Sequence, residues 1–499
     1  MKTPSEDLYK LIESLNQHEK RFFSIHSKRY KENPKIITFY NLILANKSLE
    51  EDVLSKQLKI KKQELKYYKR DLYKSLIKSL DLFYLTQNKP HEILSTINHI
   101  KILINKGLFD QAKKLARDAK KICKEFEIYD SLILLDVLDA KIIINARTGA
   151  EDLLSIKQVN KESSDNLSVL TLALTYEKLK NEILLFTKKN KFANNSDLIA
   201  LIEGYFEHEL IKKHPLTESK KILINYYYIN YLLYSSIDYW AKAQLNIEKA
   251  IKTIESGGLL FIEDSEYLNY LLDLAKSYIH NNDKVNVLSL FKKVKKYIAN
   301  LPEKQLNELI KTLSLSFEKL EIEFLYNKAD EYDTFVQKIY NLKNTADFMY
   351  MRIEEQKELQ FLLIKHLFHQ KRLKETVKEI NVYENNYLKI NIFEDYNEHF
   401  VIIKLIIHYE LGNFEVIESM VRSYLRQNNI SKNSEYLNLV LNTFKKEKYF
   451  NDEPLINKKR IRSFLEVIQK YNLKRHNYID ETKYFDLENW LKEKAKSTS

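Results

Sequence analysis

The chain has 499 residues, of which only six are glycine and six are proline, and its formal net charge is +12. So few turn-forming residues exclude a β-sandwich or an α/β fold of this length, because both need many tight turns, whereas helical pairs need few. The hydrophobic residues, 44% of the chain, can bury a large core. The composition therefore predicts an all-α protein.

Positive charge is concentrated at the two ends of the chain. Residues 1–90 contain 19 Lys and Arg against 11 Asp and Glu, and residues 440–499 contain 14 against 9. Since the whole chain carries +12, the stretch between these ends has a net charge of −1. Two basic terminal regions thus flank a middle that is close to neutral.

The start of the chain is not typical of a secretory signal, because residues 1–17 lack an apolar core region. No apolar run approaches the roughly 18 residues that span a bilayer. The single cysteine, Cys123, fits a reducing compartment, and we expect it to pack as a small apolar side chain. These features predict a soluble, cytoplasmic protein without membrane association.

Amphipathic patterns fill the first 84 residues. Residues 5–32 are predicted to form one helix or two, and residues 36–44 another. A capping-box spacing at Ser48 and Glu51 then predicts a new helix start. The segment that follows is strongly basic, since residues 56–78 contain nine Lys and Arg against two acidic residues.

The apolar residues of this basic segment are spaced as in a helix-turn-helix: a short helix, a turn around Ile60 and a second helix over residues 63–80. The positions that set this spacing are Leu54, Leu58, Ile60, Leu65 and Leu72. In a DNA-binding interpretation, Gln63 or Lys66 lies near base edges and four side chains face phosphates. These candidate nucleic-acid contacts are Lys62, Lys66, Lys69 and Arg70. A basic, solvated face on the first helices of a longer array is the favoured alternative, because the usual turn glycine is absent and clustered charge alone gives only non-specific attraction.

Residues 5–84 as a whole resemble the opening of bacterial helical-repeat proteins to which no activity is assigned. The resemblance rests on a Glu-Lys-Arg-Phe-Phe stretch at residues 19–23 and on a Leu-Tyr-Lys-Ser-Leu-Ile-Lys-Ser-Leu stretch at residues 72–80. It implies a helical-repeat architecture and transfers no function.

The clearest helical pair lies at residues 91–126. Gly107 is placed to end the first helix, since glycine adopts the left-handed backbone conformation at low cost. The second helix carries apolar and small residues at helical spacing, namely Phe109, Ala112, Leu115, Ala116 and Ala119. This Gly-x-aromatic-x-x-Ala start, with a small residue seven positions later, resembles the second helix of a tetratricopeptide repeat. The resemblance implies an α-solenoid of antiparallel helical hairpins.

Weaker copies of this start recur along the chain. Their anchor residues are Trp240, Val285, Tyr332, Leu373 and Phe414, with a further candidate at Phe192. From Phe192 onward the anchors are 41 to 48 residues apart, which exceeds the roughly 34 of the tetratricopeptide repeat and predicts longer helices. We therefore expect a basic helical module at residues 1–90, a hairpin array at residues 91–440, and basic capping helices with a frayed tail at residues 441–499.

Two stretches of the array bear on its surface. Residues 145–166 are polar and are predicted to include a loop between helices. The aromatic stretch 226–240 suggests a concave groove for a peptide, although aromatic side chains at helical spacing more often belong to a core. The candidate groove residues are Tyr227, Tyr231, Tyr234 and Trp240.

No catalytic motif is present in the sequence. The six glycines form no phosphate-binding loop, and His366 and His369 have no acidic third ligand placed by the sequence. We therefore expect no enzymatic activity, no cofactor and no metal. The favoured function is a non-enzymatic scaffold that binds a protein or peptide partner on the concave surface of the array. The alternative is a transcriptional regulator whose residues 1–90 bind DNA and whose array senses a partner.

Overall fold

The computed structural model is all-α within the residues that it describes. The described ranges are 5–29, 34–45, 51–85, 89–145, 151–189, 196–257, 262–302, 307–326, 331–388, 394–427, 435–446, 454–474 and 485–497. Every regular element in these ranges is an α-helix or a short 3₁₀ helix, as the turn-poor composition predicts. The candidate anchor Phe192 and the predicted cap residue Ser48 lie outside the described residues.

The chain divides into two compact units. Unit 1 comprises residues 1–189 and 202–310, and unit 2 comprises residues 190–201 and 311–499. The divide near residue 310 falls inside the stretch that we expected to form one array, so the units do not coincide with the three predicted regions.

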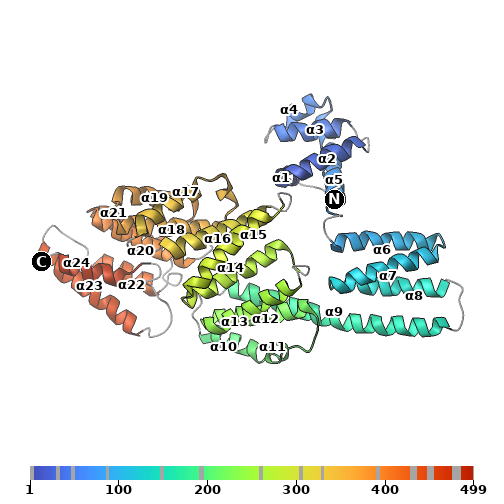
Figure 1. Cartoon of the computed structure of the whole chain (residues 1–499). Helices are drawn as coiled ribbons and strands as arrows, with labels where there is room; N and C mark the ends of the chain where they lie inside the picture. The colour runs from blue at the N-terminus through green and yellow to red at the C-terminus, as the bar shows by residue number, and fades with distance from the viewer. Residues whose placement is uncertain are drawn as a thin grey trace. The chain divides into compact units, whose positions relative to one another are not determined.

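The N-terminal module of unit 1 is built around its last helix (Figure 1). Its helices are α1 (Ser5–Ser14), α2 (Gln17–Arg29), α3 (Pro34–Ala45), α4 (Glu51–Gln57) and α5 (Leu65–Tyr84), with a 3₁₀ turn (Lys62–Glu64) before α5. α5 buries Leu65, Leu72 and Leu76 in a core shared with α1, α2 and α3. Lys59, whose φ is 51°, lies in the turn between α4 and α5. The short helix, turn and second helix that the apolar spacing predicts are therefore present.

The remaining helices of unit 1 form antiparallel pairs (Figure 1). The pairs are α6 (Lys89–Asn105) with α7 (Phe109–Glu125), α8 (Tyr129–Asn145) with α9 (Glu151–Lys189), α12 (Lys220–Ser236) with α13 (Trp240–Ser256), and α14 (Asp264–His280) with α15 (Lys284–Asn300); α10 (Ser196–Phe206) and α11 (Glu209–Lys212) precede α12. Helices such as α12, α13, α14 and α15 have 17 residues each. Two helices of this length and their connections account for a repeat longer than roughly 34 residues.

α9 is the longest helix of the described part, with 39 residues. Of the polar stretch 145–166, the residues from Glu151 onward belong to α9, and residues 146–150, which are left for the predicted loop, lie outside the described residues. The first half of α9 packs on α8, where Asn166 donates a hydrogen bond to Asp136, and the second half packs on α12. Because the first half has few neighbours, most of its residues are exposed, including the apolar Leu153, Leu154 and Leu167.

Unit 2 is also built from successive helices that form hairpins, each with a first and a second helix. Its elements are α16 (Glu308–Tyr326), which begins just before the divide, α17 (Tyr332–Lys343), a 3₁₀ helix (Ala346–Tyr350), α18 (Ile353–His369), α19 (Leu373–Asn386), α20 (Glu394–Glu410), α21 (Phe414–Gln427), α22 (Glu435–Lys446), α23 (Pro454–Lys474) and α24 (Leu487–Ser497). α24 is fastened to α20, because Trp490 Nε1 and Lys494 Nζ lie 2.7 Å and 2.6 Å from the two carboxylate oxygens of Glu410. The frayed tail predicted for the last residues is therefore wrong as far as Ser497.

The turn between paired helices depends on one residue in the left-handed backbone conformation. At the first turn this residue is Gly107, with φ of 74°, and the next N–H, that of Leu108, donates to the carbonyl of Leu103 at 2.9 Å. A positive φ recurs at Asp238, Asn282, Lys371 and Gly412, and also at Glu127, in the connection from one pair (α6 and α7) to the next. The next helix begins two residues later in every case, which makes the predicted anchors Phe109, Trp240, Leu373 and Phe414 the first residues of α7, α13, α19 and α21. The predicted anchor Val285 is instead the second residue of α15.

We predict opposite effects for alanine at two glycines. An added Cβ has no neighbouring atom within 4 Å at Gly107 or at Gly204, but only Gly107 has a positive φ. Gly107→Ala should lower the free energy of unfolding by about 1–2 kcal/mol, because alanine is strained in the left-handed conformation. Gly204→Ala, inside α10, should raise it by about 0.5–1 kcal/mol. Urea unfolding followed by circular dichroism measures both, and changes of the same sign would contradict the turn geometry.

Candidate functional site

Most of the aromatic stretch on α12 belongs to the core. Tyr228 and Tyr231 are 8% and 4% exposed, and their rings stack with centroids 5.6 Å apart. Tyr270 of α14 packs on Tyr228 with ring centroids 4.4 Å apart. Burial raises the pKa of all three hydroxyl groups well above the usual range. The assignment of Tyr231 to an open groove is therefore wrong, because α14 supplies neighbours that the sequence of α12 does not show.

The other candidate groove residues face different neighbours. The hydroxyl of Tyr227 lies 3.0 Å from Nε2 of His214. Tyr234 packs on an aromatic ring of α10 with centroids 4.8 Å apart. Trp240 stacks on His280 with centroids 3.8 Å apart. Each of these three rings is therefore packed against a separate partner within the chain.

A group of polar side chains that the sequence analysis missed lies on α9, α12 and α14. The side chain of Lys180 on α9 is only 9% exposed, and its Nζ lies 2.9 Å from Glu177 and 3.6 Å from Glu266 of α14. Asn225 of α12 donates a hydrogen bond to Glu177 at 3.0 Å. The side chains of Glu177 and Glu266 are 44% and 41% exposed. The buried ammonium group therefore holds two carboxylates that still reach solvent.

Asp273, seven residues after Glu266 on α14, is a third carboxylate, and its side chain is 15% exposed. It accepts a hydrogen bond from the Tyr228 hydroxyl at 2.8 Å, and it lies 2.9 Å from Nζ of Lys276. Because burial and then the Asp273 charge raise the pKa of Tyr228, this hydroxyl remains a donor at neutral pH. We call Glu177, Glu266 and Asp273 the carboxylate face. It overlies the buried tyrosine rings of α12 and α14.

A carboxylate from a distant turn fixes the N-terminus of α12. Glu127, the left-handed residue between α7 and α8, accepts hydrogen bonds from the backbone N–H groups of Lys220 at 2.8 Å and Lys221 at 3.1 Å. It also accepts one from the hydroxyl of Ser219 at 2.7 Å. The first N–H groups of a helix have no partner within the helix, and a negative charge there complements the helix dipole. Glu127 thereby holds the polar side chains of α12 in place.

Unit 2 contains a comparable buried lysine. Nζ of Lys319 on α16 lies 2.9 Å from Glu323 and 2.8 Å from Glu358 of α18. Burial raises the pKa of Glu323 to about 7, although the Lys319 charge opposes the shift and the Glu358 charge adds to it. The two helices are also joined by a hydrogen bond from Ser316 to Glu355 at 2.7 Å. One ammonium group shared by two carboxylates therefore ties α16 to α18.

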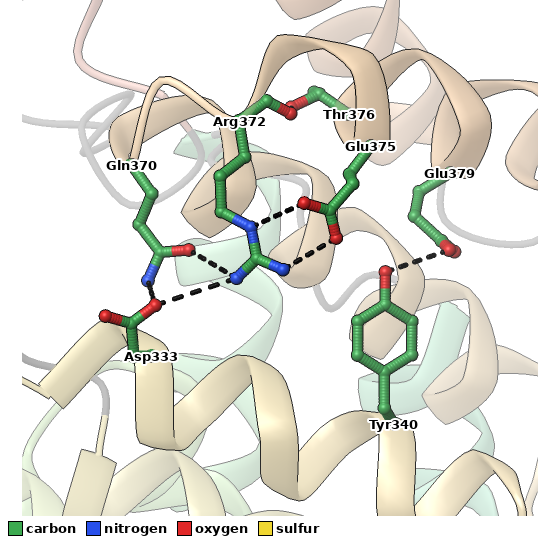
Figure 2. A network of polar contacts seen from close by, with 7 residues as sticks. All are labelled: Asp333, Tyr340, Gln370, Arg372, Glu375, Thr376 and Glu379. Carbon is green, nitrogen blue, oxygen red and sulfur yellow. Dashed lines mark hydrogen bonds and ion pairs between the residues drawn. The ribbon is translucent and has the colours of Figure 1, made fainter.

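A second polar network of unit 2 joins α17 to the turn between α18 and α19 (Figure 2). Arg372 donates two hydrogen bonds to Glu375, at 2.8 Å and 2.6 Å, and lies 3.6 Å from Asp333 of α17. The same Arg372 hydrogen bonds lower the pKa of Glu375. Figure 2 also shows Tyr340 donating to Glu379, at 3.1 Å. Since these groups are engaged with one another across neighbouring helices, the network explains how the hairpins adhere.

The histidine pair of α18 packs among aromatic rings. His366 is buried, with its ring 4.4 Å from that of Tyr332 and 4.2 Å from that of Phe335, and burial lowers its pKa to about 3. His369 stacks on Tyr332 at 5.8 Å. Among the described residues, no group of three or more His, Cys, Asp or Glu side chains could hold a metal ion.

The thiol of Cys123 is buried in α7, and burial raises its pKa to about 12. A thiol with so high a pKa is protonated at neutral pH and is a poor nucleophile. The expected packing of Cys123 as an apolar side chain is therefore confirmed.

The structure separates the basic candidates of the N-terminal module. The side chain of Lys69 is 10% exposed, and its Nζ lies 2.7 Å from Glu51 of α4. Its assignment as a phosphate contact is wrong, because the ammonium group is used inside the module. Lys62, Lys66 and Arg70 are exposed at and just before the start of α5. Three of the four candidates therefore remain at the surface.

A comparison with known protein families finds no family model that matches the chain, and a comparison with curated proteins finds no match. The helical-hairpin organisation therefore rests on the geometry of the described helices, and membership of the tetratricopeptide family is not shown. Within the ranges described above, none of the helices combines the length and the apolar character that crossing a bilayer requires.

We predict that the buried carboxyl of Glu323 makes unit 2 sensitive to pH. Its pKa of about 7 in the folded chain exceeds the ordinary 4.5. The folded state thus holds this proton more tightly, so the stability that it contributes is complete below about pH 4.5 and is lost as the pH rises through 7. The unmodified chain should therefore lose stability between pH 5 and pH 8, whereas Glu323→Gln should not. As a result, the difference in melting temperature, variant minus unmodified chain, should rise by a few degrees over this range.

Calorimetry over this pH range tests the prediction. Glu415→Gln, which removes an exposed carboxyl of α21, is the matched control and should give a difference that does not change with pH. A constant difference for Glu323→Gln as well would show that Glu323 is ionised throughout.

Proposed function

We propose that the chain is a non-enzymatic scaffold that binds a protein or peptide partner through the carboxylate face of unit 1. The observation that carries this proposal is the arrangement around Lys180, where a buried ammonium group positions the solvent-reaching carboxylates of Glu177 and Glu266. Asp273, held by Tyr228, extends the same face. Stacked helical hairpins present broad surfaces of this kind to partners.

The chemistry of the face favours a basic segment of the partner. Carboxylates accept charge-assisted hydrogen bonds from lysine and arginine side chains, and these bonds are stronger than neutral ones. The buried tyrosines and Lys180 already restrict the carboxylates, so little side-chain entropy is lost when a partner binds. A free, buried cysteine is compatible with a reducing cellular compartment, which makes a cytoplasmic partner the first to seek.

We predict that neutralising this face abolishes partner binding. In a variant with Glu177→Gln, Glu266→Gln and Lys180→Met, two of the three carboxylates of the face are lost, while no unpaired ammonium group is left buried. The unmodified chain, immobilised in native lysate, should capture a partner that mass spectrometry identifies. The purified partner should bind the variant at least tenfold more weakly, as measured by biolayer interferometry.

The control variant carries the same kinds of substitution outside the face: Glu182→Gln, Glu203→Gln and Lys178→Met, at exposed positions of α9 and α10. It should bind as the unmodified chain does. Equal binding by all three proteins would remove the carboxylate face as the site, and failure of the unmodified chain to retain any partner would remove the scaffold function.

A transcriptional regulator is the second candidate, in which the N-terminal module binds DNA and the hairpins sense a partner. The observation that favours it is the exposed basic surface at the start of α5, where Lys62, Lys66 and Arg70 remain. This candidate does not depend on the carboxylate face, because the two surfaces belong to different helices.

A further inference from the structure

A line of basic side chains runs along the exposed side of α5. Lys66, Arg70, Lys74 and Lys78 follow one another at four-residue intervals, and all four are exposed. Residues at this interval lie on one face of a helix. We call these four residues the basic stripe. It extends two turns beyond the contacts that the sequence analysis selected.

The opposite side of α5 is fixed in the module core. Leu72 and Leu76 are buried among residues of the first three helices. Lys69, which lies between the stripe and the core, is paired with Glu51 of α4. Because one side of α5 is held in this way, the basic stripe has a defined outward direction.

An exposed aromatic ring lies within the stripe. Tyr67 is 49% exposed, and its ring lies 5.0 Å from Nζ of Lys66 and 5.5 Å from the guanidinium carbon of Arg70. Like charges at four-residue spacing repel each other along a helix. The side chains of Arg70 and Asp71 form an ion pair, but both are exposed to solvent, so this pair offsets little of the repulsion. A bound polyanion would relieve it.

We propose that the basic stripe binds the phosphate backbone of duplex DNA. The twelve residue steps from Lys66 to Lys78 extend about 18 Å along the helix, which is long enough to contact several successive phosphates. α5 also follows a short helix and a turn at Lys59, the order in which helix-turn-helix proteins present the helix that enters the major groove. The proposal deepens the second candidate function and is independent of the scaffold function.

A membrane surface fits the stripe less well. Helices that lie in a membrane interface bury an apolar face among the lipids. The apolar face of α5 is already occupied by the module core, and the exposed side offers Tyr67 and Ile77 as its large apolar residues. The observations therefore favour a polyanion that needs only charge and hydrogen bonds, as the DNA backbone does.

The test uses the full chain and a fluorescently labelled 30-base-pair duplex of arbitrary sequence, with binding followed by anisotropy between 50 and 300 mM salt. Arg70→Glu with Lys74→Glu should raise the Kd at least tenfold at the lowest salt. It should also reduce the slope of log K against log salt by about two, since each phosphate contact contributes about 0.9. Lys292→Glu with Lys296→Glu, an exposed pair of the same spacing on α15, should change the Kd less than twofold.

Each other outcome overturns some part of the proposal. No binding by the unmodified chain at 50 mM salt removes both the stripe and the regulator function. If the stripe variant still binds DNA, or if the α15 variant loses binding to the same extent, the stripe is not the binding site, although the regulator function remains possible for another surface. Competition by polyglutamate as strong as that by DNA would assign the stripe to acidic polypeptides. If circular dichroism shows that the glutamate variant is unfolded, the milder pair Lys74→Gln and Lys78→Gln is measured against the same criteria.

Discussion

The left-handed residue at the described hairpin turns is the constraint on which the described architecture depends. It ends one helix, and the following helix begins two residues later, so the length and register of the connection are the same at Gly107, Asp238 and Gly412. At Asp238 and Lys371 the conformation is adopted by residues with a Cβ, which costs about 1–2 kcal/mol at each turn. The packing of the two helices outweighs that cost, since each helix buries several apolar side chains. Because this turn repeats, the first helix of one hairpin lies next to the first helix of another hairpin.

This constraint also explains how much of the fold the sequence could reveal. Gly107 and the anchor residues Phe109 and Trp240 marked the starts of second helices, because an apolar residue in the first turn follows a fixed connection. The anchor at Val285 was displaced by one residue, because Asn282, and not the next residue Asp283, takes the left-handed position. The first half of α9 was missed for a different reason. A helix half with one packed neighbour carries no continuous apolar face, and its mixed polar sequence does not distinguish it from a loop.

Buried lysines account for the part of the candidate site that sequence patterns did not reveal. Lys69 lies between the buried residues Leu65 and Leu72, and Lys180 lies between the buried residues Tyr176 and Ile183. In both cases the lysine occupies an apolar stripe at helical spacing, the only signal that it would be buried. The sequence pattern placed Lys69 at the surface, because the sequence of one helix does not show which acidic group of another helix will face it. That partner comes from another helix, as it also does for Lys319.

The same interaction also fixes the positions of surface charges. A buried ammonium group is costly to desolvate, and apolar side chains of similar volume often stabilise a protein as well or better. Lys180 also orients its neighbours. Its buried ammonium group needs both charge partners, so the side chains of Glu177 and Glu266 must point toward it. An apolar residue there would leave both carboxylates free to turn into solvent. The lysine therefore gives unit 1 a surface whose charges have fixed positions, and fixed charges discriminate between partners more sharply than mobile ones.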